Sequence, residues 1–191
     1  HLYKSSASDT TFLINNGATG STINDGTIFG VSESGSFAIQ NRENTDTYFL
    51  TNNEERFRIK NDGKIGIGIT APSYRIHSQG NTSTDGTLAM EINSSTDNYP
   101  GLSFMRSRGS SSVKSAVANS DKVGLISFSG YNSNSNYVSG AYIFGIVDGT
   151  PGATNIPMRI SFWTGDNGNY PSERMTIKPD GSILKNGATT T

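Results

Sequence analysis

The stretch that decides the fold is ERFRIKNDGKIGIGI, residues 55–69. Apolar residues alternate with polar residues or glycine on both sides of the central pair Asp62-Gly63. Alternation with a period of two is typical of a β-strand, and an Asp-Gly pair readily adopts the positive φ that a tight hairpin turn requires. The stretch therefore predicts a β-hairpin.

This pattern returns near the end of the chain as ERMTIKPDGSI, residues 173–183. An internal repeat indicates a modular protein, and we predict two β-rich modules. The first spans residues 1–78 and ends in the Asp-Gly hairpin and its Gly/Ile strand. The second spans residues 79–191 and contains Tyr- and Asn-rich loops and the second copy of the hairpin.

The rest of the chain also reads as short strands. Alternating runs recur at residues 12–14, 37–39 and 158–162, and Asn-Gly or Asp-Gly pairs separate them. No window carries a convincing apolar stripe with the 3.6-residue period of a helix. We therefore predict an all-β fold.

The composition limits the kinds of partner and predicts association. The 191 residues carry a net charge of -1 and no Cys, so neither a phosphate-binding basic stripe nor a thiolate metal site is expected. No apolar run approaches membrane-spanning length. Only 32% of the residues are hydrophobic, which favours cores completed by oligomerisation. The chain begins at His1 without a signal-peptide pattern, and we expect a fragment of a longer protein.

The repeated hairpin supplies the candidates for contacts between chains. Adjacent strand residues face opposite sides, so a neighbouring Glu and Arg cannot pair with each other and are expected to reach other strands or chains. Gly66 and Gly68 leave one strand face bare, which suits three chains converging on an axis, a bulge or a tightly packed single-chain barrel. The candidate interface residues are Glu55, Arg56, Ile65, Ile67, Glu173 and Arg174.

Two stretches resemble the stalk repeats of phage tail fibres and tailspikes that lie upstream of an endosialidase-type intramolecular chaperone domain. The first runs from residue 53 to residue 76, and the second joins VGLISFSGY at residues 123–131 to IVDG, PMRISF and ERM further on. Together they cover more than half of the chain. The second hairpin departs from the family pattern because Leu184-Lys185 replaces alternating Gly and Ile.

The resemblance implies an elongated homotrimer about a three-fold axis, located extracellularly in the virion tail fibre. Its partners would be neighbouring fibre segments and a host cell-surface glycan or receptor, and its function would be host attachment or spacing of an attachment tip. Two alternatives are a polysaccharide-cleaving tailspike and a monomeric carbohydrate-binding module. Nucleic acid binding and membrane insertion are not expected.

Neither an enzyme nor a cofactor is predicted. A glycan-cleaving tailspike would need a pair of carboxylates, for which the candidates are Asp121, Asp148, Asp166 and Glu173. Asp148 precedes glycine and Asp166 lies in a polar loop, so turn roles are expected for both. His1 and His77 match no metal-site spacing, which leaves an axial ion at His77 in a trimer as the one metal hypothesis.

Aromatic and amide side chains in polar loops suggest a contact with sugars. Aromatic faces stack on sugar rings, and Asn side chains can hydrogen-bond to hydroxyls. Trp163 lies in a predicted strand and is also expected to pack in the core. The candidate glycan-binding residues are Tyr131, Asn134, Tyr137, Trp163 and Tyr170.

Overall fold

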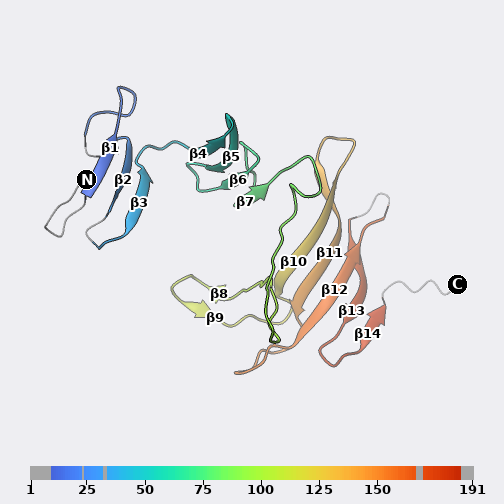
Figure 1. Ribbon diagram of the computed structural model, residues 1–191. Coiled ribbons are helices and arrows are strands. Elements are labelled where there is room, and N and C mark those ends of the chain that lie inside the picture. Colours follow the sequence, from blue (N-terminus) through green and yellow to red (C-terminus); the bar gives the residue numbers. More distant parts are fainter. Residues whose placement is uncertain (1–9, 23, 32–33, 167–169, 186–191) are drawn as a thin grey trace. The chain divides into compact units, whose positions relative to one another are not determined.

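The computed structural model describes residues 10–22, 24–31, 34–166 and 170–185. These residues form fourteen β-strands and no helix, which confirms the all-β prediction (Figure 1). The chain divides into two compact units, His1–Met90 and Glu91–Thr191. Over the described ranges, no helix is present that could cross a membrane.

The first unit contains two sheets. The first sheet is antiparallel and has the order β1-β2-β3, with β1 at Thr10–Ile14, β2 at Thr27–Val31 and β3 at Phe37–Asn41. The second sheet has the order β4-β5-β6-β7, and its strands are Thr47–Thr51, Glu54–Ile59, Ile65–Ile67 and Ile76–Ser78. Only the β6–β7 pair is parallel.

The second unit is built on one five-stranded antiparallel sheet in sequence order. Its strands are β10 (Lys122–Tyr131), β11 (Tyr137–Val147), β12 (Met158–Thr164), β13 (Ser172–Ile177) and β14 (Ile183–Lys185). A small two-stranded ribbon precedes it, with β8 at Arg108–Gly109 and β9 at Lys114–Ser115.

The two copies of the sequence repeat form the same hairpin. In the first, the Lys60 amide donates to the Lys64 carbonyl and the Gly63 amide to the Lys60 carbonyl, each at 2.8 Å. In the second, the Lys178 amide donates to the Ser182 carbonyl and the Gly181 amide to the Lys178 carbonyl, each at 2.9 Å. The φ angles of the two turn glycines are 80° and 82°. The predicted hairpin is thus confirmed twice.

A β-bulge precedes each hairpin at the same place in the repeat. Phe49 pairs with Phe57 and Leu50 with Glu55, so Arg56 is the extra residue in β5. In β13 the extra residue is Arg174, between the partners of Phe162 and Trp163. A bulge locally re-aims the strand's side chains, and here it does so next to both Glu-Arg pairs.

Gly66 and Gly68 are explained by close backbone approach within the chain. A Cβ on Gly66 would lie 2.3 Å from the Ile69 carbonyl oxygen, and one on Gly68 would lie 2.4 Å from that of Gln79. Gly68 also has a φ of 69°, which favours glycine. The side of the strand that Gly66 and Gly68 leave bare is therefore occupied by backbone of the same chain. Convergence of three chains is not needed to explain these glycines.

Buried apolar side chains are few. Among the described residues they are Ile28 in the first unit and Val117, Phe144, Ile146 and Val147 in the second. The second unit's core therefore lies at the end of β11 and under residues 117–121, where the Val147 amide donates to the Asp121 carbonyl. Apart from this core, each sheet is a single layer, and large apolar side chains on it are exposed.

Candidate functional site

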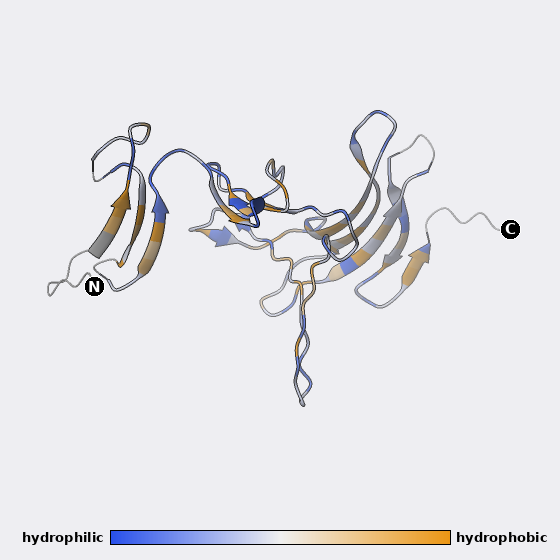
Figure 2. Ribbon diagram, turned by 45° about the horizontal axis from the view of Figure 1, so that its top comes forward, coloured by the Kyte–Doolittle hydropathy of each residue, from blue (hydrophilic) through white to orange (hydrophobic). Residues whose placement is uncertain are grey.

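The first sheet has an uncovered apolar face, which we call face 1. Residues opposite each other in antiparallel strands share a face, and the register aligns Phe12, Phe29 and Ile39. The large apolar side chains of face 1 are 41% to 69% exposed. They gather in the strands (Figure 2) and comprise Phe12, Ile14, Phe29, Val31, Phe37 and Ile39.

The second sheet has a similar apolar face, face 2. Its register aligns Phe49 with Phe57 and Ile67, and Ile59 with Ile65 and Ile76. Four of these six side chains are at least 40% exposed. The predicted interface residues Ile65 and Ile67 both lie on face 2, which therefore places them where a partner chain could cover them.

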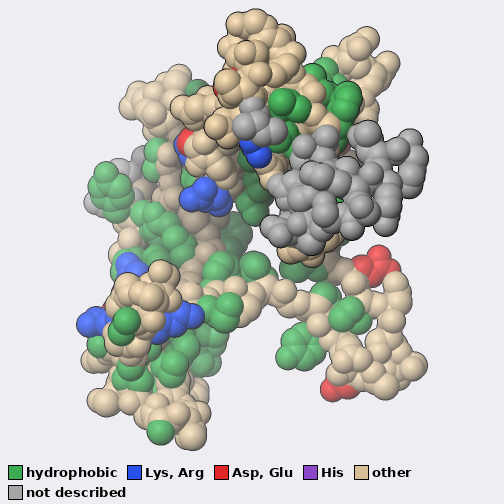
Figure 3. Space-filling model, turned by 90° about the vertical axis from the view of Figure 1, so that its left-hand side faces the viewer, with side chains coloured by type: hydrophobic (Ala, Val, Ile, Leu, Met, Phe, Trp, Pro, Cys, Tyr) green, Lys and Arg blue, Asp and Glu red, His purple; other side chains and the backbone are tan. Residues whose placement is uncertain are grey.

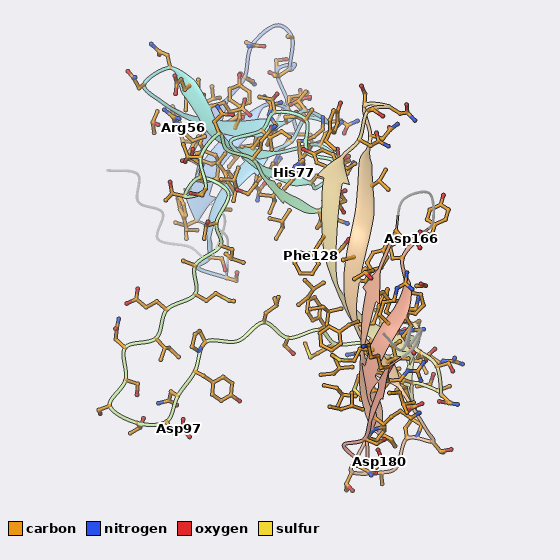
Figure 4. The ribbon with its side chains drawn as sticks, turned by 90° about the vertical axis from the view of Figure 1, so that its right-hand side faces the viewer. Arg56, His77, Asp97, Phe128, Asp166 and Asp180 are labelled. Atoms are coloured by element: carbon orange, nitrogen blue, oxygen red, sulfur yellow. The ribbon has the colours of Figure 1, made fainter. Side chains whose placement is uncertain are left out.

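The five-stranded sheet carries the largest apolar face, face 3. Its floor is formed by Gly124 opposite Gly145, in a groove of about 460 Å³ that Phe104 borders. Phe128, labelled in Figure 4, is 54% exposed on this face. Face 3 consists of Ile126, Phe128, Ile143, Ile160, Phe162, Met175, Ile177 and Ile183.

The accessible surface of the single chain is large for its mass. Its accessible area is 14676 Å², whereas a folded monomer of 20.4 kDa is expected to expose about 8,800 Å². Hydrophobic side chains accordingly form broad patches on the surface (Figure 3). Broad exposed apolar patches mark interaction surfaces.

The opposite face of the five-stranded sheet carries a packed cluster of side chains. Phe144 packs edge-on against Trp163 at 5.5 Å between ring centroids, and the Lys122 ammonium lies 4.4 Å from the Phe144 ring centre. The Trp163 indole N–H donates to the Ser161 hydroxyl at 2.8 Å, and that hydroxyl donates to Glu173 at 2.5 Å. This cluster buries Phe144 and Ser161 on the side opposite face 3.

The Glu-Arg pairs of the repeat make contacts within the chain. Arg58, in the same strand as Glu55, donates to Glu55 and to Asp46 and lies 5.3 Å from the Tyr48 ring centre. Hydrogen bonds from Arg58 lower the pKa of Glu55. Within the chain, Glu55 pairs with Arg58 of its own strand because the bulge at Arg56 brings residues 55 and 58 together. The expected contact of Glu55 with another chain stays a prediction.

The remaining candidate interface residues lie at or beside the bulges. The Arg56 guanidinium contacts Glu54 and donates to the Thr51 hydroxyl at 3.1 Å. Arg174 lies 3.7 Å from Asp166. Both arginines are more than 40% exposed, so each can also reach a second chain, and the predicted ion pair between chains remains a prediction.

Asp121 is held by two arginines. Arg108 donates to both its oxygens at 2.7 and 2.9 Å, the Ala118 amide donates at 2.9 Å, and Arg106 lies at 3.1 Å. The Arg108 hydrogen bonds, followed by the Ala118 amide, hold the pKa of Asp121 well below its usual range. A carboxylate that stays ionised is a poor proton donor.

Asp148 is a cross-link between strands. The Lys178 ammonium and the Arg159 guanidinium each lie 2.7 Å from one of its oxygens. The hydrogen bond from Lys178, followed by that from Arg159, lowers the pKa of Asp148. With Glu173 bonded to Ser161 and Asp166 near Arg174, each of the four acid-base candidates has a partner in its own chain.

His77 has local partners, and His1 lies outside the described residues. The Ser73 amide donates to His77 Nδ1 at 3.3 Å, and the Tyr74 ring packs edge-on at 5.5 Å. Within the described ranges, no three His, Asp or Glu side chains gather as metal ligands would. The axial-ion hypothesis is not tested by these contacts.

Three of the five candidate glycan-binding residues come together at the tip of the β10–β11 hairpin. Tyr131 pairs with Tyr137, and their rings meet edge-to-face at 5.2 Å while 64% and 75% exposed. Asn134 lies in the turn between them, where its backbone N–H donates to Asn132 Oδ1 at 3.1 Å. The tip therefore presents two aromatic rings beside side-chain amides.

The two other candidates lie elsewhere. Trp163 aligns with Tyr142, roughly 15 Å along β11 from Tyr137 at the usual rise per residue, and its packing is that of a core residue. Tyr170 is 90% exposed, two residues before β13. The structure therefore groups Tyr131, Asn134 and Tyr137, without Trp163.

The sequence analysis missed a cluster of hydroxyls next to the tyrosine pair. The oxygens of Ser127, Ser129 and Ser139 lie 2.8 to 3.3 Å apart on the face that also carries Tyr131 and Tyr137. The signal was the Ser-x-Ser spacing in β10, which places both serines on one side of a strand.

No family model and no curated protein matches the chain. It is similar to the solved carboxy-terminal domain of the bacteriophage T5 L-shaped tail fibre, with a TM-score of 0.53, 14% identity, and coverage of 96% of this chain and 80% of that chain. A second structure, of the same domain with its intra-molecular chaperone domain, has a TM-score of 0.53 and 13% identity over 96% of this chain and 55% of that chain. The chain therefore has a phage tail-fibre-like, all-β fold.

Proposed function

We propose that this chain is a segment of a homotrimeric phage tail fibre, exposed on the virion and joined to neighbouring fibre segments. The observation that carries the proposal is the set of uncovered apolar faces 1, 2 and 3, together with the tail-fibre-like fold. A trimer supplies partners for all three faces at once, and its closed symmetry limits further association.

Sedimentation equilibrium at several concentrations tests this assembly. A trimer has a mass of about 61 kDa, three times the 20.4 kDa of one chain. A stable folded monomer would contradict the proposal and favour the carbohydrate-binding module instead. From the resemblance of the stalk repeats we also propose an endosialidase-type chaperone domain in the parent protein. Coexpression with such a domain would test this proposal through the yield of trimer.

The fibre segment is proposed to contact a host cell-surface glycan through the tip of the β10–β11 hairpin. Tyr131 and Tyr137 supply exposed ring faces, and the Ser127, Ser129 and Ser139 hydroxyls and the Asn turn supply hydrogen bonds. Three such tips in one fibre would raise a weak affinity through avidity.

Binding to glycan arrays and host cells tests the tip. The double substitution Tyr131→Ala and Tyr137→Ala should reduce binding at least tenfold, because stacking surface is lost from every tip. Tyr74→Ala is the matched control, since Tyr74 is also an exposed tyrosine (66%) but lies in the first unit. Equal binding by both variants would place the receptor contact elsewhere.

The proposal includes that the chain is not an enzyme. Asp121 and Asp148 have lowered pKa values and are engaged by cations, whereas a glycosidase acid needs a raised carboxyl pKa. Incubation with host capsule or lipopolysaccharide should release no reducing sugar. Release that is abolished by Asp121→Asn would favour the depolymerase.

A further inference from the structure

Residues 87–107 form a long segment without regular secondary structure. They lie in no strand or helix, and each of them is exposed. Loops longer than about 15 residues without secondary structure are uncommon in compact domains and are usually functional or disordered. Asp97 marks the turn of this segment in Figure 4, and we call residues 87–107 the arm.

The arm has the side-chain pattern of two strands. Leu88, Met90 and Ile92 alternate with polar or small residues before the turn, as do Leu102 and Phe104 after it. Leu88, Ile92 and Leu102 are 78%, 47% and 62% exposed. Disordered segments are poor in such apolar residues, so the pattern indicates a segment that becomes ordered against an apolar surface.

The arm's backbone is also without ladder partners. Two backbone hydrogen bonds are found for residues 87–107, from the Thr87 amide to Thr84 and from the Asn98 amide to Thr96, and both are local. Burying a segment of this length requires partners for the other amides and carbonyls. Strands from a neighbouring copy can provide them.

The base of the arm is fixed next to face 3. The Phe104 side chain lies over Gly124, where a Cβ would be 2.6 Å away, and Arg106 donates to the Lys122 carbonyl at 2.7 Å. The ten residues on either side of Asp97 would each span about 33 Å when extended, and five strands span about 19 Å, so one limb can cross the whole of face 3.

Charge agrees with the same pairing. Between residues 87 and 105 the arm carries Glu91 and Asp97 and no Lys or Arg. Among the paired residues described for face 3, Lys185 alone is charged. The arm's one cation, Arg106, is already bonded at its base, so the rest of the arm brings two anions to an apolar surface with one cation.

We infer that the arm of one chain lies across face 3 of a second copy, with Leu88, Ile92 and Leu102 toward the sheet and its backbone paired with strands of neighbouring copies. This inference rests on the proposed trimer and specifies how its subunits interlock. It makes residues 87–107 an assembly element and predicts that the copies exchange segments.

Disulfide trapping tests the exchange, because the chain contains no Cys and every single-Cys variant can cross-link only between chains. Ile92→Cys chains should be refolded together with chains of a second tag length that carry Ile126→Cys, Ile143→Cys or Ile160→Cys, and then oxidised. We expect a mixed arm–sheet dimer at one of these positions, at least fivefold above that given by Glu91→Cys, which points the other way in the limb.

A substitution experiment gives the second measurement. Leu88→Ser, Ile92→Ser and Leu102→Ser combined should weaken the trimer at least tenfold in sedimentation, whereas Ala89→Ser, Glu91→Gln and Ser103→Ala combined should leave it unchanged. A wild-type monomer would overturn both the trimer and the arm. A wild-type trimer with no arm–sheet disulfide above the control and no effect of the serine variant would overturn the arm alone.

Discussion

At the scale of single residues, the two units use the same charge at the same place. Lys60 and Lys178 occupy equivalent positions in the repeat, and each approaches an aspartate, Asp46 at 3.9 Å and Asp148 at 2.7 Å. The arginine that completes the group comes from a different strand in each case, Arg58 from β5 and Arg159 from β12. The Lys–Asp ion pair is therefore retained in both units, while the strand that supplies the arginine differs.

Asp148→Asn should lower the free energy of unfolding by about 1–2 kcal/mol at neutral pH, because two charge-assisted hydrogen bonds lose their anion. The pKa of Asp148 is lowered in the folded chain, so its stabilisation is complete above the ordinary carboxyl pKa of about 3.9 and is lost as the pH falls below that value. Denaturant unfolding measured from neutral to acidic pH should show the two proteins converging in acid. Asp97→Asn, at an exposed turn, is the control, and a difference that persists in acid would contradict the assignment.

Gly181→Ala should cost about 1 kcal/mol, because Gly181 has a φ of 82° that an L side chain adopts only with strain. A Cβ there would meet no atom within 4 Å, so the cost is purely that of the backbone. Gly86→Ala is the control, since that site is equally open and has no positive φ. Thermal unfolding compares the two, and equal melting temperatures would show that the turn relaxes.

At the scale of elements, the repeated hairpin is a unit with fixed hydrogen bonds and a bulge at a fixed position. Its bulge explains why Glu55 contacts Arg58, three residues away, whereas a regular strand would have placed them on opposite faces. The sheets around it are single layers, so each hairpin contributes an exposed apolar face.

Grafting the first turn onto the second tests this equivalence. Pro179→Asn with Ser182→Lys converts KPDGS into KNDGK, and the free energy of unfolding should fall by no more than about 1 kcal/mol, mainly because proline no longer restricts the unfolded chain. Chemical denaturation provides the measurement. The same graft combined with Asp180→Ala should lose more stability, because Asp180 accepts a hydrogen bond from the backbone amide of residue 182 at 2.9 Å. A large loss of stability in the simple graft would show that the two turns are not equivalent.

The hairpins were predictable from the sequence because their signal is local. Alternation and Asp-Gly pairs specify strands and turns within about ten residues of each other. The bulges at Arg56 and Arg174 were not predictable, since a bulge depends on the register with the neighbouring strand. For the same reason the hydroxyl cluster of Ser127, Ser129 and Ser139 was missed, because Ser139 joins it only through pairing across the hairpin.

At the scale of the whole molecule, the open faces determine how the chain behaves. Faces 1, 2 and 3 are open in an isolated chain, and the arm lacks ladder partners. Low apolar content pointed to association, but which side of each sheet is open could be known only once the strands were paired. The packed cluster opposite face 3 contains Trp163 and Glu173, so one candidate glycan residue and one acid-base candidate have structural partners.

Ile160→Asp on face 3 should convert the proposed trimer into monomers or aggregates, because three symmetry-related carboxylates would be buried without partners, each at a cost of several kcal/mol. Ser127→Asp, on the opposite face of the same sheet, should retain the trimer. Sedimentation velocity measures both. A trimeric Ile160→Asp variant with unchanged stability would show that face 3 is not the interface.

The shared backbone of the two hairpins has an evolutionary consequence. Because both copies leave and re-enter their sheets through the same turn geometry, a genetic crossover between the two encoding segments would join β5 to β14, or β13 to β6, without distorting either strand. Unequal recombination at these sites would then add or delete a whole module while preserving every turn. Related genes are expected to differ in length in steps of one module, with breakpoints clustered at the Asp-Gly codons.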